Sequence, residues 1–127
     1  MIALFVIQIH SCTTMTPEKI LEQQFNITLK GFDYKIETFE EQWCPNGDGH
    51  VLIVFKFNKL TDENVNYFQS LGLKKLPFSE NKQIPDRFLS EKGFYLMKNE
   101  DINDERDFKL FIVDIDRNQA FLYYQCM

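Results

Sequence analysis

Hydrophobic and polar residues alternate along one stretch of the chain and form an almost continuous apolar run in the next. Tyr34 and Ile36 alternate with charged residues, which is typical of a half-exposed strand, and the run Val51–Phe57 is apolar, β-branched or aromatic. The turn-forming sequence CPNGDG at 44–49 separates these stretches, so the pattern predicts a β-hairpin. The alternation changes phase after Thr38, which predicts a β-bulge there.

Two segments predict helices, because a capping residue precedes a stripe of apolar side chains. Residues 16–18 (TPE) combine a hydroxyl at the N-cap, a proline at the first helical position and an acid in the first turn, and predict a helix to about Gln24. Thr61 begins a second helix, which Gly72 closes. Pro85 is expected to open a short third helix.

The last third of the chain predicts three more strands. One begins at Phe94, and the other two, 108–114 and 120–126, form a hairpin that turns around 116–119. Both faces of the final strand are apolar, so it is expected to be central or to cover a partner. The predicted fold class is α+β, with an antiparallel sheet of about five strands and two or three helices packed on one face. The order of these elements is similar to that of cystatin-like and nuclear-transport-factor-like folds.

Composition narrows the class of protein. The 127 residues are enough for one domain, and 44% of them are hydrophobic. The net charge of −5 argues against nucleic acid as a partner, because domains that bind it usually carry a basic patch. After the N-terminus no stretch approaches the roughly 20 apolar residues of a membrane span, so none is expected in the mature chain.

The N-terminal run is apolar and ends at a cysteine. Residues 9–12, Ile9-His10-Ser11-Cys12, resemble the lipobox of bacterial lipoprotein signals. The resemblance implies a signal segment at 1–11, lipid on Cys12, a mature domain at 12–127 and a location on the bacterial cell envelope. The basic start of such a signal is missing, which would fit translation from further upstream. The alternative is that Ile2–Ile9 is a buried strand of a soluble intracellular protein.

Cysteine parity is consistent with a lipid anchor. The chain has three cysteines, and lipidation of Cys12 would leave Cys44 and Cys126 to form a disulfide. On the loop-entropy model such a bridge stabilises the fold by roughly 4 kcal/mol. The alternative is that Cys44 and Cys126 are two free, half-buried thiols.

No catalytic residue, metal ligand or cofactor is predicted. The sequence lacks GxSxG, HExxH and a phosphate-binding glycine loop, and it contains two histidines. The segment 114–125 resembles the opening of an EF-hand calcium loop, but Gln119 and Gln125 stand where calcium binding requires glycine and glutamate. We therefore expect a plain β-turn after Asp114.

The segment 99–107 (NEDINDERD) is strongly acidic. Such a run is typical of a solvated loop, and it can also be a docking surface for a basic partner. The candidate partner-binding residues are Glu100, Asp101, Asp104, Glu105 and Asp107.

These observations lead to three ranked hypotheses for function. The first is a non-catalytic lipoprotein domain of the cell envelope that binds another protein, with an inhibitor or immunity protein as one version. The second is a small-ligand-binding domain with an aromatic-lined pocket between sheet and helices. The third is a hydrolase that uses a pair of carboxylates.

Overall fold

The chain forms two compact units, residues 1–30 and residues 31–127. The first unit contains helix α2 (Pro17–Phe25), and the second contains a six-stranded sheet and helix α3 (Asp62–Ser70). The computed structural model describes residues 15–43, 49–80, 86, 90–99 and 108–126.

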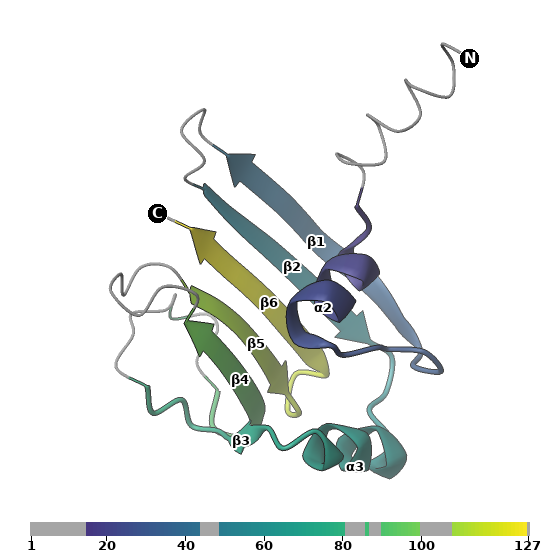
Figure 1. Ribbon diagram of the computed structural model, residues 1–127. Helices are drawn as coiled ribbons and strands as arrows, with labels where there is room; N and C mark the ends of the chain where they lie inside the picture. Colours follow the sequence, from purple (N-terminus) through teal and green to yellow (C-terminus); the bar gives the residue numbers. More distant parts are fainter. Residues whose placement is uncertain (1–14, 44–48, 81–85, 87–89, 100–107, 127) are drawn as a thin grey trace, which may run out of the picture. The chain divides into compact units, whose positions relative to one another are not determined.

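The sheet of the second unit is antiparallel, in the order β1-β2-β6-β5-β4-β3 (Figure 1). The pairs β1–β2 and β5–β6 are the two hairpins that the sequence predicts. Strand β6 lies between β2 and β5, so the apolar character of both its faces reflects a central position. The strands are β1 (Tyr34–Trp43), β2 (Gly49–Phe57), β3 (Lys74–Lys75), β4 (Gly93–Asn99), β5 (Phe108–Asp114) and β6 (Gln119–Cys126).

The predicted balance of five strands and two or three helices is wrong. In the described residues there are six strands and two helices of nine residues each, so the fold is dominated by its sheet. The additional strand, β3, has only two residues, which is too short for a visible alternation, and it exists because it pairs with β4. The third helix expected from Pro85 falls almost entirely outside the described residues.

The predicted β-bulge is confirmed on β1. Ile36 pairs with Phe55 and Thr38 pairs with Val54, so Glu37 is an extra residue on β1. Because side chains alternate between faces, one extra residue moves Phe39 onto the same face as Ile36.

Both predicted helix starts are confirmed by their capping hydrogen bonds. The Thr16 hydroxyl accepts a bond from the backbone N–H of Lys19 at 3.2 Å, and α2 ends at Asn26 in the left-handed conformation. Thr61 and Asn64 form a reciprocal capping box at the start of α3.

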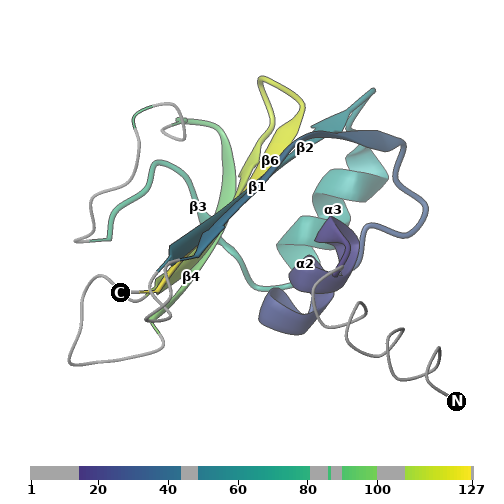
Figure 2. The ribbon, with the colours of Figure 1, turned by 90° about the horizontal axis from the view of Figure 1, so that it is seen from above.

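One face of the sheet packs against α3, and we call it the α3 face. The ring of Phe68, which is fully buried, lies 6.1 Å from that of Phe111 on β5 and 5.4 Å from that of Phe32. Figure 2 shows the sheet close to edge-on, with α3 on one side of it. Aromatic contacts therefore fix α3 on the sheet.

The other face of the sheet is also apolar, and we call it the opposite face. Leu76 and Phe78, from the segment that follows β3, pack on its cluster of buried side chains. Strand residues that contribute to this cluster include Leu52, Val54, Phe108, Leu110, Ile112 and Phe121. Strands β2 and β5 are thus buried on both faces along most of their length, which explains their continuous apolar runs.

Candidate functional site

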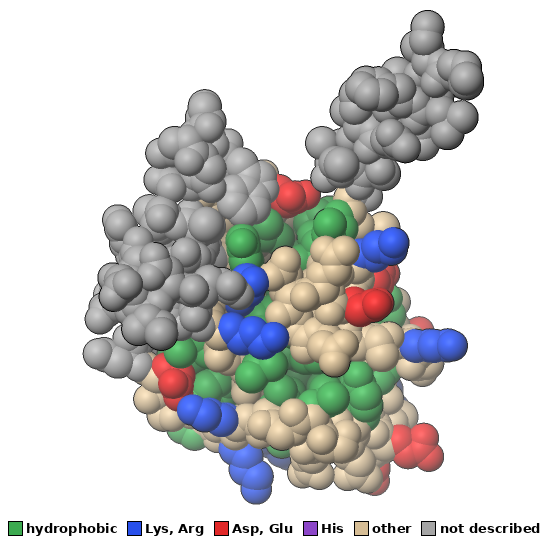
Figure 3. Space-filling model, in the orientation of Figure 1, with side chains coloured by type: hydrophobic (Ala, Val, Ile, Leu, Met, Phe, Trp, Pro, Cys, Tyr) green, Lys and Arg blue, Asp and Glu red, His purple; other side chains and the backbone are tan. Residues whose placement is uncertain are grey.

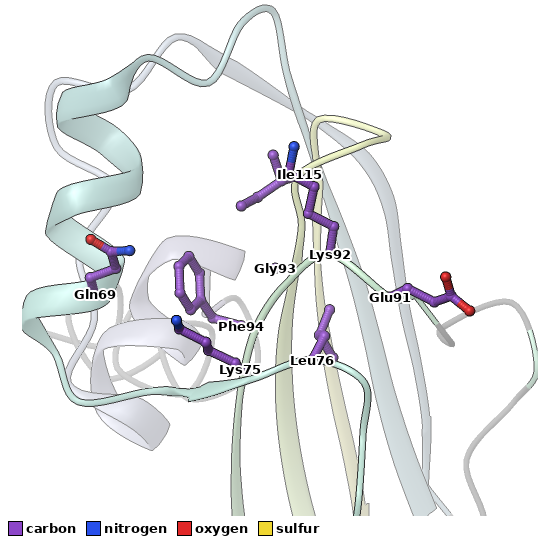
Figure 4. A pocket seen from close by; sticks show the side chains of 8 residues that line it. All are labelled: Gln69, Lys75, Leu76, Glu91, Lys92, Gly93, Phe94 and Ile115. Atoms are coloured by element: carbon purple, nitrogen blue, oxygen red, sulfur yellow. The ribbon is translucent and has the colours of Figure 1, made fainter.

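A hollow of about 220 Å³ opens where the end of α3 meets β3, the start of β4 and the residue after β5 (Figure 4). Phe94 and Leu76 are 5% and 8% exposed, so they contribute a largely buried apolar surface, to which the half-buried Ile115 adds. Lysine side chains, Lys75 and Lys92, stand beside this apolar surface.

Backbone hydrogen bonds fix the walls of the hollow. The N–H of Leu76 donates to the carbonyl of Gly93 at 3.0 Å, and the N–H of Ile115 donates to the carbonyl of Lys92 at 3.1 Å. A Cβ at position 93 would lie 1.8 Å from the carbonyl oxygen of Val113, so the close approach of β4 and β5 here requires glycine.

The charged residues that line the hollow are Lys75, Lys92 and Glu91, so the net charge of the lining is positive. Within the described part of the chain, neither Lys75 nor Lys92 forms a side-chain hydrogen bond or ion pair. The carboxylate of Glu91 points away from the hollow, whereas the amide of Gln69 lies on the α3 side of the Phe94 ring (Figure 4).

A second polar group lies on the opposite face of the sheet, around the hydroxyl of Tyr95. That hydroxyl donates to Oε2 of Glu80 at 2.8 Å and lies 3.0 Å from the hydroxyl of Ser79. Lys74 adds an ion pair to the same Glu80 oxygen at 3.1 Å. The ring of Phe78 meets that of Tyr95 edge-on at 5.0 Å. These contacts fasten the segment after β3 to the sheet.

The hydrogen bonds of this group shift the pKa values of its charged members. The Tyr95 hydroxyl, followed by the Lys74 ammonium, holds the pKa of Glu80 below its usual 4.5. The hydrogen bond and charge of Glu80 raise the pKa of Lys74 above 10.5. Both shifts favour the charged forms, so Glu80 is suited to holding the segment and unsuited to acting as a general acid at neutral pH.

The segment that resembles a calcium loop forms the predicted β-turn. Asp114 is 1% exposed, and its carboxylate accepts a bond from the N–H of Arg117 at 3.1 Å. Asn118 adopts a left-handed conformation with φ of 52°, and its side chain accepts a bond from the N–H of Leu60. These polar groups therefore serve the turn and its contact with the start of α3. No group of three metal-ligating side chains occurs in the described residues.

All but one of the candidate residues from the sequence lie outside the described residues. Cys12, Cys44 and the acidic residues Glu100, Asp101, Asp104, Glu105 and Asp107 lie outside the described residues. Cys126 belongs to the end of β6, where its backbone pairs with Gly49.

The register around Gly49 sets a condition for the predicted disulfide. Gly49 pairs with Cys126 on one side and with Trp43, the residue before Cys44, on the other. Two strand spacings amount to about 10 Å, whereas bridged cysteines keep their Cα atoms within about 7 Å. These spacings describe Trp43 and Cys126 only, and the pairing of Cys44 with Cys126 stays a prediction.

The hollow and the Tyr95 group were not anticipated from the sequence. Both depend on β3 and on the segment after it, where no hydrophobic alternation exists. Gly93 was a usable signal, since a glycine at the first position of a strand often marks close backbone approach.

Comparison of the chain with protein-family models, curated proteins and solved structures finds no match. In the described residues, no helix is long and apolar enough to cross a membrane. The function is therefore inferred from the site and the sequence.

Proposed function

We propose that this chain is a non-catalytic domain that binds another protein and is held in a bacterial cell envelope by lipid on Cys12. The observation that carries the proposal is the hollow beside Gly93. Its volume of about 220 Å³ is below the roughly 300–1,000 Å³ of sites that enclose small molecules. It is open, and its size suits one side chain of a larger partner.

The contacts of two described carboxylates, Glu80 and Asp114, support a binding role over hydrolysis. Glu80 is held by Tyr95 and Lys74, and Asp114 is held by its own turn and by Arg117 at 3.5 Å. A carboxylate-dependent hydrolase needs one acid with a raised pKa beside a second that is ionised. The pKa of Glu80 is lowered instead, which favours permanent charge.

Charged and apolar side chains are mixed on the surface of the described residues. Figure 3 shows acidic and basic side chains interspersed on one face, with hydrophobic side chains between them. Phe39 is 40% exposed and Leu71 is 37% exposed, so large apolar groups do reach solvent. The acidic residues of 100–107 would add attraction for a basic part of the partner.

The lipid anchor is testable by metabolic labelling with a clickable fatty acid in a bacterial host. The proposal predicts label on the wild type, none on Cys12→Ala and full label on the matched variant Cys126→Ala. Equal labelling of wild type and Cys12→Ala would contradict the anchor and leave the binding role to the next experiment.

Protein binding is testable by affinity purification of the tagged full-length chain from detergent-solubilised envelopes. We expect one protein to co-purify in a fixed ratio and to bind the purified chain with a Kd in the micromolar range or below, which is about 8 kcal/mol of binding free energy. Failure to recover any saturable protein partner contradicts the proposed function. Loss of the partner's own activity on binding would identify the inhibitor or immunity version.

A further inference from the structure

We infer that the hollow beside Gly93 is the docking site for an acidic segment of the protein partner that carries one large apolar side chain. This inference rests on the proposed function and adds the place and the chemistry of the contact. The apolar side chain would lie against Phe94, Leu76 and Ile115. Flanking carboxylates would meet Lys75 and Lys92.

The apolar part of the hollow is preorganised for a side chain. Phe94 and Leu76 are already buried, and the two backbone bonds at Gly93 and Lys92 hold the walls in place. A rigid site loses little conformational entropy on binding, so a small apolar contact contributes more of its gross energy to affinity.

The lysines of the hollow favour a partner segment with negative charge. Lys75 and Lys92 both line the hollow, whereas the neighbouring Lys74 is paired with Glu80. Successive residues of β3 point to opposite faces of the sheet, so Lys74 turns to Glu80 and Lys75 turns to the hollow. Glu91 also lines the hollow, but its carboxylate is directed away, so the ammonium groups of Lys75 and Lys92 are the charges closest to an anionic segment.

We assign the acidic segment to a foreign partner, because long-range charge disfavours the approach of a second copy of the chain. The net charge of −5 makes two copies repel each other at long range. Positive charge at the hollow would help to orient an approaching acidic partner.

The probe is the capped peptide Ac-Asp-Phe-Asp-NH2, titrated into the ¹⁵N-labelled full-length protein in detergent micelles. We expect amide shifts to concentrate at Lys75, Gly93, Phe94 and Ile115. Raising NaCl from about 50 mM to about 200 mM should weaken the effect, because these charges are exposed. The basic peptide Ac-Lys-Phe-Lys-NH2 should produce no such shifts.

Matched charge reversals test the assignment. Replacement of both lysines of the hollow (K75E/K92E) should weaken peptide binding by about tenfold, which corresponds to about 1.4 kcal/mol. K35E/K59E changes the net charge equally at exposed positions that do not line the hollow and should leave binding unchanged. Gln69→Trp, which would fill the hollow from α3, should also abolish the shifts.

Several results would overturn the docking site: shifts that K75E/K92E does not change, an equal response to the basic peptide, or self-association of the chain that displaces the acidic peptide.

Affinity purification from envelopes separates the proposal of the docking site from the proposed function. A partner that binds wild type and K75E/K92E equally leaves protein binding intact and makes the assignment to the hollow wrong. Absence of any partner for wild type contradicts the proposed function itself.

Discussion

The hydroxyl of Tyr95 donates a 2.8 Å hydrogen bond to Oε2 of Glu80, and Tyr95 itself is only 1% exposed. The bond joins the middle of β4 to the segment that follows β3. It therefore holds Leu76 and Phe78 over the apolar cluster of the opposite face. The carboxylate of Glu80 therefore fastens the segment after β3, which has no regular secondary structure, to the sheet.

Removal of this hydroxyl should destabilise the fold. Tyr95→Phe keeps the buried ring and loses the bonds to Glu80 and Ser79, so we expect the free energy of unfolding to fall by about 1–2 kcal/mol. Lys74→Ala should cost less, because the Lys74 side chain is 66% exposed and solvent screens its ion pair. Urea unfolding of the three proteins measures both effects. A larger loss for Lys74→Ala would contradict the central place of Tyr95.

Stability should depend on pH through the same carboxylate. The folded-state pKa of Glu80 is below its usual 4.5, so its stabilising contribution is present above about pH 4.5 and is lost as pH falls through the folded pKa. The difference in urea midpoint between wild type and Glu80→Gln should stay constant from about pH 6 to 8 and shrink toward about pH 3. A difference in urea midpoint that grows on acidification would contradict the lowered pKa of Glu80 in the folded state.

Gly93 should tolerate no side chain. Gly93→Ala would place a Cβ 1.8 Å from the carbonyl oxygen of Val113, at a φ of +146°, so β4 and β5 would have to separate. We expect a loss of at least about 3 kcal/mol. Gly72→Ala is the control, since φ is +75° but no atom lies within 4 Å of the added carbon, and it should cost about 1 kcal/mol. Similar thermal unfolding of both variants would contradict this explanation.

The packing of α3 on the sheet should depend on the ring of Phe68. Phe68 is fully buried against Phe111 and Phe32, so Phe68→Ala should cost about 3–5 kcal/mol. Phe39→Ala removes the same atoms from a side chain that is 40% exposed and should cost less than about 1 kcal/mol. Chemical denaturation compares them directly, and equal losses would mean that the Phe68 contacts do not hold α3.

Local sequence signals predicted the parts of the fold that local chemistry determines. The caps at Thr16 and Thr61, the bulge at Glu37 and both hairpins follow from side-chain type and spacing alone. The β-turn after Asp114 is also confirmed, and it follows from the polar residues of the segment.

The parts that were missed depend on contacts between distant segments. Strand β3 exists only because Lys74 and Lys75 meet β4, and two lysines carry no strand pattern. The hollow combines α3, β3, β4 and the residue after β5, so no window of sequence contains it. The number of strands was underestimated for the same reason.

The most direct test of the central claim is photo-crosslinking in living cells from position 69, at the rim of the hollow. With p-benzoylphenylalanine in place of Gln69, we predict one discrete adduct between this chain and a second protein in the membrane fraction. The same probe in place of Lys35 serves as the control and should give none. Absence of any protein adduct from position 69 would contradict the claim that this domain binds a protein there.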